Sequence, residues 1–400
     1  MFLRQWMLRI FNIIILIIVV VVLLNISRSV NMFLKTNNIT PFQRTSFHDK
    51  KAGIPQNNLV IKIDSAKEDS KSANVNGGQI MFPENRPLSG YIVYDCSIKY
   101  AGMCGGLADR LSGILSTFGL AIISRRHFKI RHDKPCALDN YLEPHKYDWK
   151  LNESIIPITA QFMNLIDNNS YHLRVSAVKT NHLDNVFRND VTLIRMNWDM
   201  TQDFRLRPNI TDDFPWITKL QYADIYSELY HYLFKPGKIV LDKFADIEKR
   251  RKHGLLACSH ARAGDNRNAD FTRIWKFLSN LDSSKYDIYL ASDQQYVRDA
   301  GIKYLHGYDV ITMSGRLGNI DFSEVGCDAF MTSMVDFYTL TKCDLLVITD
   351  SGFSMISAYV RGTSDNLYCT GKLDIFPCSR NTLEDVYPGN MLAPTRLKLN

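Results

Sequence analysis

Short apolar runs alternate with helical patterns over residues 255–369, and this alternation constrains the fold more than any other feature of the chain. The runs that predict strands are 255–258, 286–290, 310–312, 345–348 and 367–369. The stretches that predict helices are 271–281, 295–302, 334–341 and 354–359. Strands that alternate with helices form parallel sheets covered by helices. We therefore predict a doubly wound α/β domain here.

Polar side chains follow three of these predicted strands at the points where they end. The clusters are His260/Arg262/Asp265, Ser292/Asp293 and Thr349/Asp350/Ser351/Gly352/Ser354. Because open α/β sheets bind ligands beyond the carboxyl ends of their strands, we expect the three clusters to border one crevice.

The residue types in these clusters indicate an anion site. Arg262 can form two parallel hydrogen bonds to phosphate groups, and Gly264 allows a sharp turn beside it. Ser351–Ser354 begins a predicted helix, where hydroxyls and free backbone amides favour an anion. An arginine opposite a helix N-terminus predicts a diphosphate clamp, which would stabilise charge on a leaving diphosphate. A surface turn with a solvated arginine is the alternative.

A second strand–turn–helix unit begins the globular part near Ser89. A strand is predicted at 91–94, a helix at Leu107–Ser124 and a further strand from 128, so a parallel sheet is expected here too. The turn Gly105-Gly106 lacks the third glycine of a dinucleotide fingerprint. Asp109 and Arg110, in the first helical turn, either face a ligand or are a capping charge and a solvated residue. Aromatic residues in 131–235 predict helices that complete this domain.

The length of 400 residues predicts two domains, which we assign to 89–235 and 236–400. The net charge of +7 is compatible with an anionic small substrate or an acidic polymer and requires neither. The sequence has neither zinc-finger spacing nor another nucleic-acid-binding motif, so nucleic acid is not an expected partner.

The N-terminus predicts the compartment. Ile10–Leu24 is nearly all Ile, Val and Leu and follows Arg4 and Arg9. We predict a cytoplasmic tail at 1–9, a type II transmembrane anchor at 10–28 and a flexible lumenal stem at 29–88, in the Golgi or endoplasmic reticulum membrane. A cleaved signal peptide is the alternative, but the residues after Leu24 form a poor cleavage site.

All eight cysteines lie at or beyond Cys96, which suits disulfides in a lumenal part. The pairs that could close local loops are Cys96/Cys104 and Cys369/Cys378, whereas Cys258 and Cys343, beside apolar strands, are interpreted as buried free thiols. The predicted glycosylation sites are Asn38, Asn152, Asn168 and Asn209.

Three motifs follow one another along the second predicted domain: HARAGD at 260–265, YLASD at 289–293 and VDFYTLTKCDLLVITDSGFSMISAYVRG at 335–362. They resemble the fucosyltransferase superfamily with the HxRxG/T-D signature, which includes the α1,2-, α1,6- and protein O-fucosyltransferases. The resemblance covers roughly 255–362. CGGLADRLSGI at 104–114 stands in place of the family's N-terminal glycine motif.

This resemblance implies a GT-B fold, with two Rossmann-like domains facing a cleft and GDP-fucose bound mainly by the second. It implies inverting, metal-independent transfer of fucose to a glycan or glycoprotein hydroxyl, with no cofactor. Arg262 matches the essential arginine, His260 the nucleoside-contacting histidine and Asp336 the guanine-contacting aspartate, although Asp336 could instead cap its helix. The chain contains no Asp-x-Asp motif of the kind that holds a metal-bridged diphosphate.

The predicted donor-binding residues are His260, Arg262, Gly264, Asp293, Asp336, Ser351, Gly352, Phe353, Ser354, Gly105, Gly106 and Arg110. Besides Arg262, the catalytic candidates are Asp109 and Asp265, either of which could serve as general base.

The chain departs from the family at Ala263, where α1,2 and α1,6 members have a second arginine, and at 106–110, where GLADR replaces Gly-x-Gly-Asn. The acceptor and linkage therefore stay open.

Two other functions are compatible with a lumenal α/β protein. A sulfotransferase would need a phosphosulfate loop after the first strand, which CGGLADR does not supply. A non-catalytic glycan-binding relative is the second.

Overall fold

The computed structural model describes residues 88–388 with ten short gaps. The gaps are 100–101, 167–171, 174–175, 177–178, 180–182, 184, 208–209, 214–215, 265–268 and 322–325. The predicted tail, the anchor and the stem up to residue 87 lie outside the described residues, as do Asp265 and the sequons at Asn38, Asn168 and Asn209. None of the helices in the described part of the chain combines the length and apolarity needed to cross a membrane.

The first lobe, residues 89–235, is built on a four-stranded sheet. Its strands are β1 (Tyr91–Cys96), β2 (His127–His132), β4 (Gln161–Leu165) and β5 (Val191–Met196), in the order β2-β1-β5-β4. All neighbouring pairs are parallel. Helix α2 (Leu107–Ile123) packs on this sheet with almost every residue buried. Gly113 permits the close approach, because a Cβ there would lie 1.8 Å from the carbonyl oxygen of Met196.

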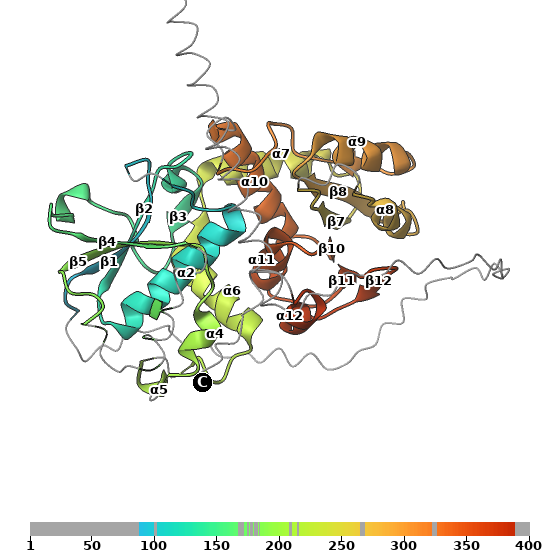
Figure 1. Cartoon of the computed structure of the whole chain (residues 1–400). Helices are drawn as coiled ribbons and strands as arrows, with labels where there is room; N and C mark the ends of the chain where they lie inside the picture. The colour runs from blue at the N-terminus through green and yellow to red at the C-terminus, as the bar shows by residue number, and fades with distance from the viewer. Residues whose placement is uncertain are drawn as a thin grey trace, which may run out of the picture. The chain divides into compact units, whose positions relative to one another are not determined.

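The second lobe, which follows residue 235, is built on a six-stranded sheet (Figure 1). Its strands are β7 (Leu255–Ala261), β8 (Tyr286–Ser292), β9 (Val310–Ile311), β10 (Leu345–Ile348), β11 (Leu367–Thr370) and β12 (Ile375–Pro377), in the order β12-β11-β10-β7-β8-β9. Only β12 is antiparallel to its neighbour among these described strands. The helices are α8 (Thr272–Leu278), α9 (Gln295–Tyr304), α10 (Gly326–Leu340), α11 (Gly352–Arg361) and α12 (Leu383–Val386). The predicted α/β alternation is confirmed.

Helices between the sheets join the two lobes. The remaining elements of the described residues are β3 (Leu142–Pro144), α4 (Thr201–Phe204), α5 (Ile210–Asp213), α6 (Tyr222–Leu233), β6 (Phe234–Pro236) and α7 (Lys238–Arg250), with single 3₁₀ turns at Leu138–Asn140, Glu153–Ile155 and Arg380–Thr382. Helix α6 packs against α11, and α7 packs against α10. The ring of Tyr359 lies 5.3 Å from that of Tyr222 and 5.5 Å from that of Tyr226. One hydrophobic cluster therefore contains residues of both lobes.

The helices predicted in 131–235 are present as α4, α5 and α6, but this region also supplies strands that were not predicted. Two of the four strands of the first sheet, β4 and β5, come from this region. Strand β5 is buried at all six positions, including Arg195. Its guanidinium lies 3.7 Å from the buried carboxylate of Asp95, so a charged residue occupies a buried position near the end of a core strand. That charge interrupts the apolar pattern by which a strand is recognised.

All eight cysteines are paired. The expected local pairs Cys96–Cys104 and Cys369–Cys378 are confirmed. The interpretation of Cys258 and Cys343 as free thiols is wrong, because these two residues form a disulfide with a Cα–Cα distance of 5.9 Å. Cys343 lies in the turn between α10 and β10, and β10 pairs with β7, which carries Cys258. The fourth disulfide, Cys136–Cys327, joins the two lobes.

Candidate active site

A pocket of about 440 Å³ is lined by residues from both lobes. The first lobe contributes Gly106–Asp109, at the start of α2. The second lobe contributes His260, Arg262, Ser292, Asp293, Leu317–Ile320, Thr332, Ser333, Asp336 and Asp350–Phe353. This volume lies in the range of small-molecule sites, about 300–1,000 Å³.

Residues from each of the three polar clusters at the strand ends line this pocket. Strands β10, β7 and β8 are adjacent and parallel, so their carboxyl ends lie at one edge of the sheet. Arg262, Asp293 and Ser351 follow these three strands and line the same pocket. The expectation of a shared crevice is therefore confirmed.

Arg262 presents a guanidinium that is oriented by Asp293, the residue after the neighbouring strand β8. Its Nη1 lies 2.8 Å from Oδ2 of Asp293, and 40% of the Arg262 side chain is exposed to solvent. The backbone N–H groups of Ala263 and Gly264 each donate to the Asp293 carboxylate at 2.9 Å. Gly264 has a φ of +56°, a conformation that favours glycine. Asp293 thus fixes the turn that carries Arg262.

His260 is buried and uncharged. Burial lowers the pKa of His260 to about 3, and the nearby charges of Arg262 and Arg298 act in the same direction. Its Nδ1 lies 2.7 Å from Oγ of Ser354, and that hydroxyl accepts the backbone N–H of Thr349. The ring packs against Phe353 with a centroid distance of 4.7 Å. Ser354 therefore orients His260 from behind, while His260 lines the pocket.

Helix α11 begins at the pocket. Ser351 is its N-cap residue in extended conformation, and Gly352 and Phe353 form the first helical positions. All three line the pocket. Backbone N–H groups in the first turn of a helix have no carbonyl partner within the helix and carry a partial positive charge. This helix start can therefore bind an anion beside Arg262.

Asp336 lies on α10, within the helix rather than at a cap position, and its carboxylate is held by two side chains. The hydroxyl of Tyr289 donates to Oδ1 at 2.5 Å, and Nη2 of Arg298 lies 2.7 Å from Oδ2. Burial raises the pKa of Asp336, and the charge of Arg298 opposes that shift. Each carboxylate oxygen can accept a second hydrogen bond, so Asp336 could accept from a ligand in the pocket.

Asp109 enters the pocket from the first lobe. Its Oδ2 accepts the backbone N–H of Gly106 at 2.7 Å, which confirms the predicted capping role. Burial raises the pKa of Asp109, while Arg110 and Arg262 oppose the shift by their charge. Asp109 and Arg262 line the same pocket from opposite lobes. A carboxylate of raised pKa next to an anion site can act as a base.

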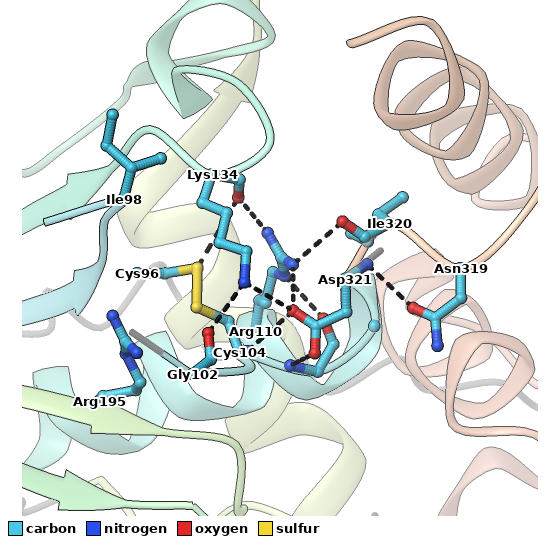
Figure 2. A network of polar contacts seen from close by, with 12 residues as sticks. Cys96, Ile98, Gly102, Cys104, Arg110, Lys134, Arg195, Asn319, Ile320 and Asp321 are labelled. Atoms are coloured by element: carbon cyan, nitrogen blue, oxygen red, sulfur yellow. Dashed lines mark hydrogen bonds and ion pairs between the residues drawn. A yellow bond between two sulfur atoms is a disulfide. The ribbon is translucent and has the colours of Figure 1, made fainter. Parts of the chain in front are cut away.

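Four predicted donor-binding residues do not line the pocket in the described part of the chain: Gly264, Ser354, Gly105 and Arg110. Arg110 is buried, which rules out the solvated alternative, and its guanidinium points to Asp321 at 3.1 Å (Figure 2). The N–H of Gly105 donates to the same carboxylate at 3.0 Å. These two residues contact the second lobe rather than the pocket.

Sequence reasoning missed one wall of the pocket. Leu317–Ile320, Thr332 and Ser333 line it, but none was singled out. The first segment has no periodic apolar pattern, and the other two residues stand one helical turn before Asp336 on α10. That spacing places them on the same face of the helix and could have identified them once Asp336 was chosen.

The fold is similar to that of a FUT1 mutant from Arabidopsis thaliana in complex with GDP, with a TM-score of 0.52 and 13% identity over 77% of this chain and 76% of that chain. NodZ alpha-1,6-fucosyltransferase co-crystallised with GDP, a protein from Bradyrhizobium, has a TM-score of 0.48 and 13% identity over 73% and 98% of the two chains. POFUT1 in complex with GDP-fucose has a TM-score of 0.41 and 12% identity over 72% and 99%. No protein-family model matches the sequence, and no curated protein matches it. The first likeness establishes a shared α/β fold with parallel sheets.

Proposed function

We propose that this chain is an inverting, metal-independent fucosyltransferase that moves fucose from GDP-fucose to a hydroxyl of a glycan or glycoprotein. The observation that carries the proposal is the pocket where Arg262 and the start of α11 lie together with Asp336. The fold shared with a FUT1 mutant whose structure is in complex with GDP supports it. The HARAGD and ITDSGFS segments support it from the sequence.

GDP-fucose would bind mainly to the second lobe. The guanine N1–H and amino groups would donate to Asp336, whose carboxylate is already oriented by Arg298 and Tyr289. The diphosphate would lie between Arg262 and the first amides of α11, because both offer N–H groups to an anion. The neutral ring of His260 would contact the nucleoside without adding charge.

The transfer step uses groups from both lobes. An acceptor oxygen attacks the anomeric carbon on the face opposite GDP. As this bond forms, the bond from the anomeric carbon to the β-phosphate oxygen breaks, and its electron pair stays on GDP. Arg262 and the α11 amides stabilise that growing charge. The hydroxyl proton passes to Asp109, whose pKa is raised by burial. Asp265 is the alternative base and lies outside the described residues.

We also propose a lumenal location behind a type II anchor. The apolar run Ile10–Leu24 after two arginines supports the anchor. Four disulfides suit an oxidising compartment such as the Golgi or endoplasmic reticulum lumen. Asn152 is exposed and would be open to glycosylation, so Asn152→Gln should remove one glycan from the expressed protein if the chain is translocated.

Thermal shift of the secreted Ser89–Asn400 fragment tests the donor assignment. GDP should raise the melting temperature at concentrations where UDP does not. A shift with adenosine phosphosulfate alone would instead assign a sulfotransferase. GDP binding without release of GDP from GDP-fucose, across a glycan array, would assign a non-catalytic relative. Full activity in excess EDTA is expected, and its loss would contradict metal independence.

A further inference from the structure

Asp321 of the second lobe inserts its carboxylate into the first lobe. Its Oδ1 accepts the backbone N–H of Cys104 at 2.9 Å, and its Oδ2 accepts that of Gly105 at 3.0 Å. Nη2 of Arg110 lies 3.1 Å from Oδ1, and Nζ of Lys134 lies 3.9 Å away. The Asp321 and Arg110 side chains are 3% and 1% exposed. Figure 2 shows the Asp321 carboxylate linked by dashed lines to Arg110 and Lys134.

The partners of Asp321 are fixed by further contacts of the first lobe. Arg110 donates from Nε to the carbonyl of Gly105 at 2.8 Å and contacts Nε2 of His132 at 3.2 Å. Cys104 is bonded to Cys96 at the end of β1. The Cys136–Cys327 disulfide joins the same two regions covalently. The Asp321 contact therefore links the lobes beside a disulfide that also joins them.

This contact occupies a turn that otherwise resembles an anion site. Successive backbone N–H groups before a helix favour a bound anion. Here the N–H groups of Cys104 and Gly105 donate to Asp321, and that of Gly106 donates to Asp109. The protein's own carboxylates take the place that a phosphate would take, so the turn serves alignment rather than donor binding.

The chain segments on both sides of the Asp321 contact line the pocket. On one side, Gly105 is followed by Gly106–Asp109, which line it. On the other side, Asp321 follows Leu317–Ile320, the wall that sequence reasoning missed. A shift of either segment would change the position of Asp109 relative to Arg262.

We propose that Asp321 is a positioning residue, which aligns the acceptor-side base Asp109 with the donor-side Arg262 by fixing the glycine turn against the 317–320 segment. The proposal rests on the proposed fucosyl transfer. Misplacement of a reacting group by about 1 Å can cost about 100-fold in rate, so Asp321 should govern kcat more than donor affinity.

The test compares Asp321→Asn with Asp224→Asn. Asp224, on α6, pairs with Arg380 of the second lobe and does not line the pocket, among the residues described. Both variants neutralise a carboxylate that pairs across the lobes, Asp321 with Arg110 and Lys134, and Asp224 with Arg380. Asp321→Asn should lower kcat for GDP-fucose by about 100-fold, change GDP affinity much less, and increase amide exchange in peptides covering 102–110 and 313–321. Asp224→Asn should keep the kcat and the exchange of both peptides.

Each outcome separates the two proposals. Equal kcat losses in both variants, or unchanged exchange in Asp321→Asn, would overturn the positioning role. A larger effect on GDP affinity than on kcat would assign Asp321 to nucleotide binding and also overturn it. If Asp321→Asn does not fold, Asp321→Glu keeps the charge but lengthens the side chain, and the same comparison applies. If the wild type does not turn over GDP-fucose, both the proposed fucosyl transfer and this positioning role are contradicted. In that case, increased amide exchange in Asp321→Asn would confirm only the contact between the lobes.

Discussion

Arg262 and Asp293 form an ion pair of 2.8 Å between the ends of two adjacent strands. The same carboxylate accepts two backbone N–H groups of the Arg262 turn. Asp293 is thus occupied by protein donors, and its main role is to orient the arginine. The strand ends provide this geometry because β7 and β8 are parallel neighbours.

Asp293→Asn should therefore weaken catalysis through Arg262. An amide can accept at most part of these hydrogen bonds and cannot pair with the guanidinium charge. We expect kcat to fall by roughly tenfold, since one charge-assisted hydrogen bond contributes about 1.5 kcal/mol or more. Steady-state kinetics measures this. Asp299→Asn, on the exposed side of α9, is the matched control and should retain wild-type kcat.

Arg262→Ala should remove the main stabilisation of departing GDP. Loss of one such electrostatic donor typically costs about 10²–10³ in kcat. The side chain is 40% exposed, so the melting temperature should stay near that of the wild type. Arg262→Lys keeps the charge without the two-pronged geometry and should give an intermediate rate. A normal rate in the alanine variant would refute the assignment, whereas exposed Arg250→Ala should have no effect.

Asp109 should set the acidic limb of the pH–rate profile. Burial raises its pKa above the ordinary value of 3.8, and only the ionised carboxylate accepts a proton. Transfer should therefore fall as the pH drops through this raised pKa, and Asp109→Asn should lower kcat by about 10²–10⁴ and remove the limb. Because the raised pKa makes the charged form unfavourable in the folded state, the asparagine variant should melt no lower at pH 7. An acidic limb that persists in this variant would assign the base elsewhere.

Two buried histidines should make the protein sensitive to acid. Burial lowers the pKa of both His260 and His132 to about 3. In the unfolded chain each titrates near 6.5, so the unfolded state binds more protons between pH 6.5 and 3. Stability should fall with decreasing pH across this window, by about 1.4 kcal/mol per pH unit for each histidine. Melting temperatures at pH 7, 6, 5 and 4 measure it, and His260→Gln should have a shallower slope.

The second lobe was predictable because its strands are short, apolar and separated by amphipathic helices. The strand at 345–348 matches β10 residue for residue, and the predicted clusters at the strand ends do meet. The strands of the first lobe were harder to predict, because buried charged residues replace apolar residues in its core. Arg195 in β5 and Arg131 in β2 both interact with Asp95, and such pairing depends on strands distant in sequence.

The same reason explains the errors in the site. Arg110 resembles a ligand-binding residue because it lies in the first turn of α2, which follows a glycine turn. Its real partner, Asp321, lies more than two hundred residues later in a segment without regular structure. The pattern of neighbouring residues predicts which side chains lie at the end of a strand. It does not predict which distant carboxylate of the same chain pairs with an arginine there. Asp109 was legible as a capping residue because its partner is three residues away.

The tyrosine packing between α6 and α11 has a consequence for how this protein can be dissected. Tyr359 and Tyr226 belong to opposite lobes but to one hydrophobic cluster. A fragment that begins after residue 235 would expose this aromatic surface to water, so it should precipitate rather than serve as a small nucleotide-binding unit. Exchanging the first lobe for that of another protein of this fold would require transplanting α6 together with the second lobe, since α6 packs against α11.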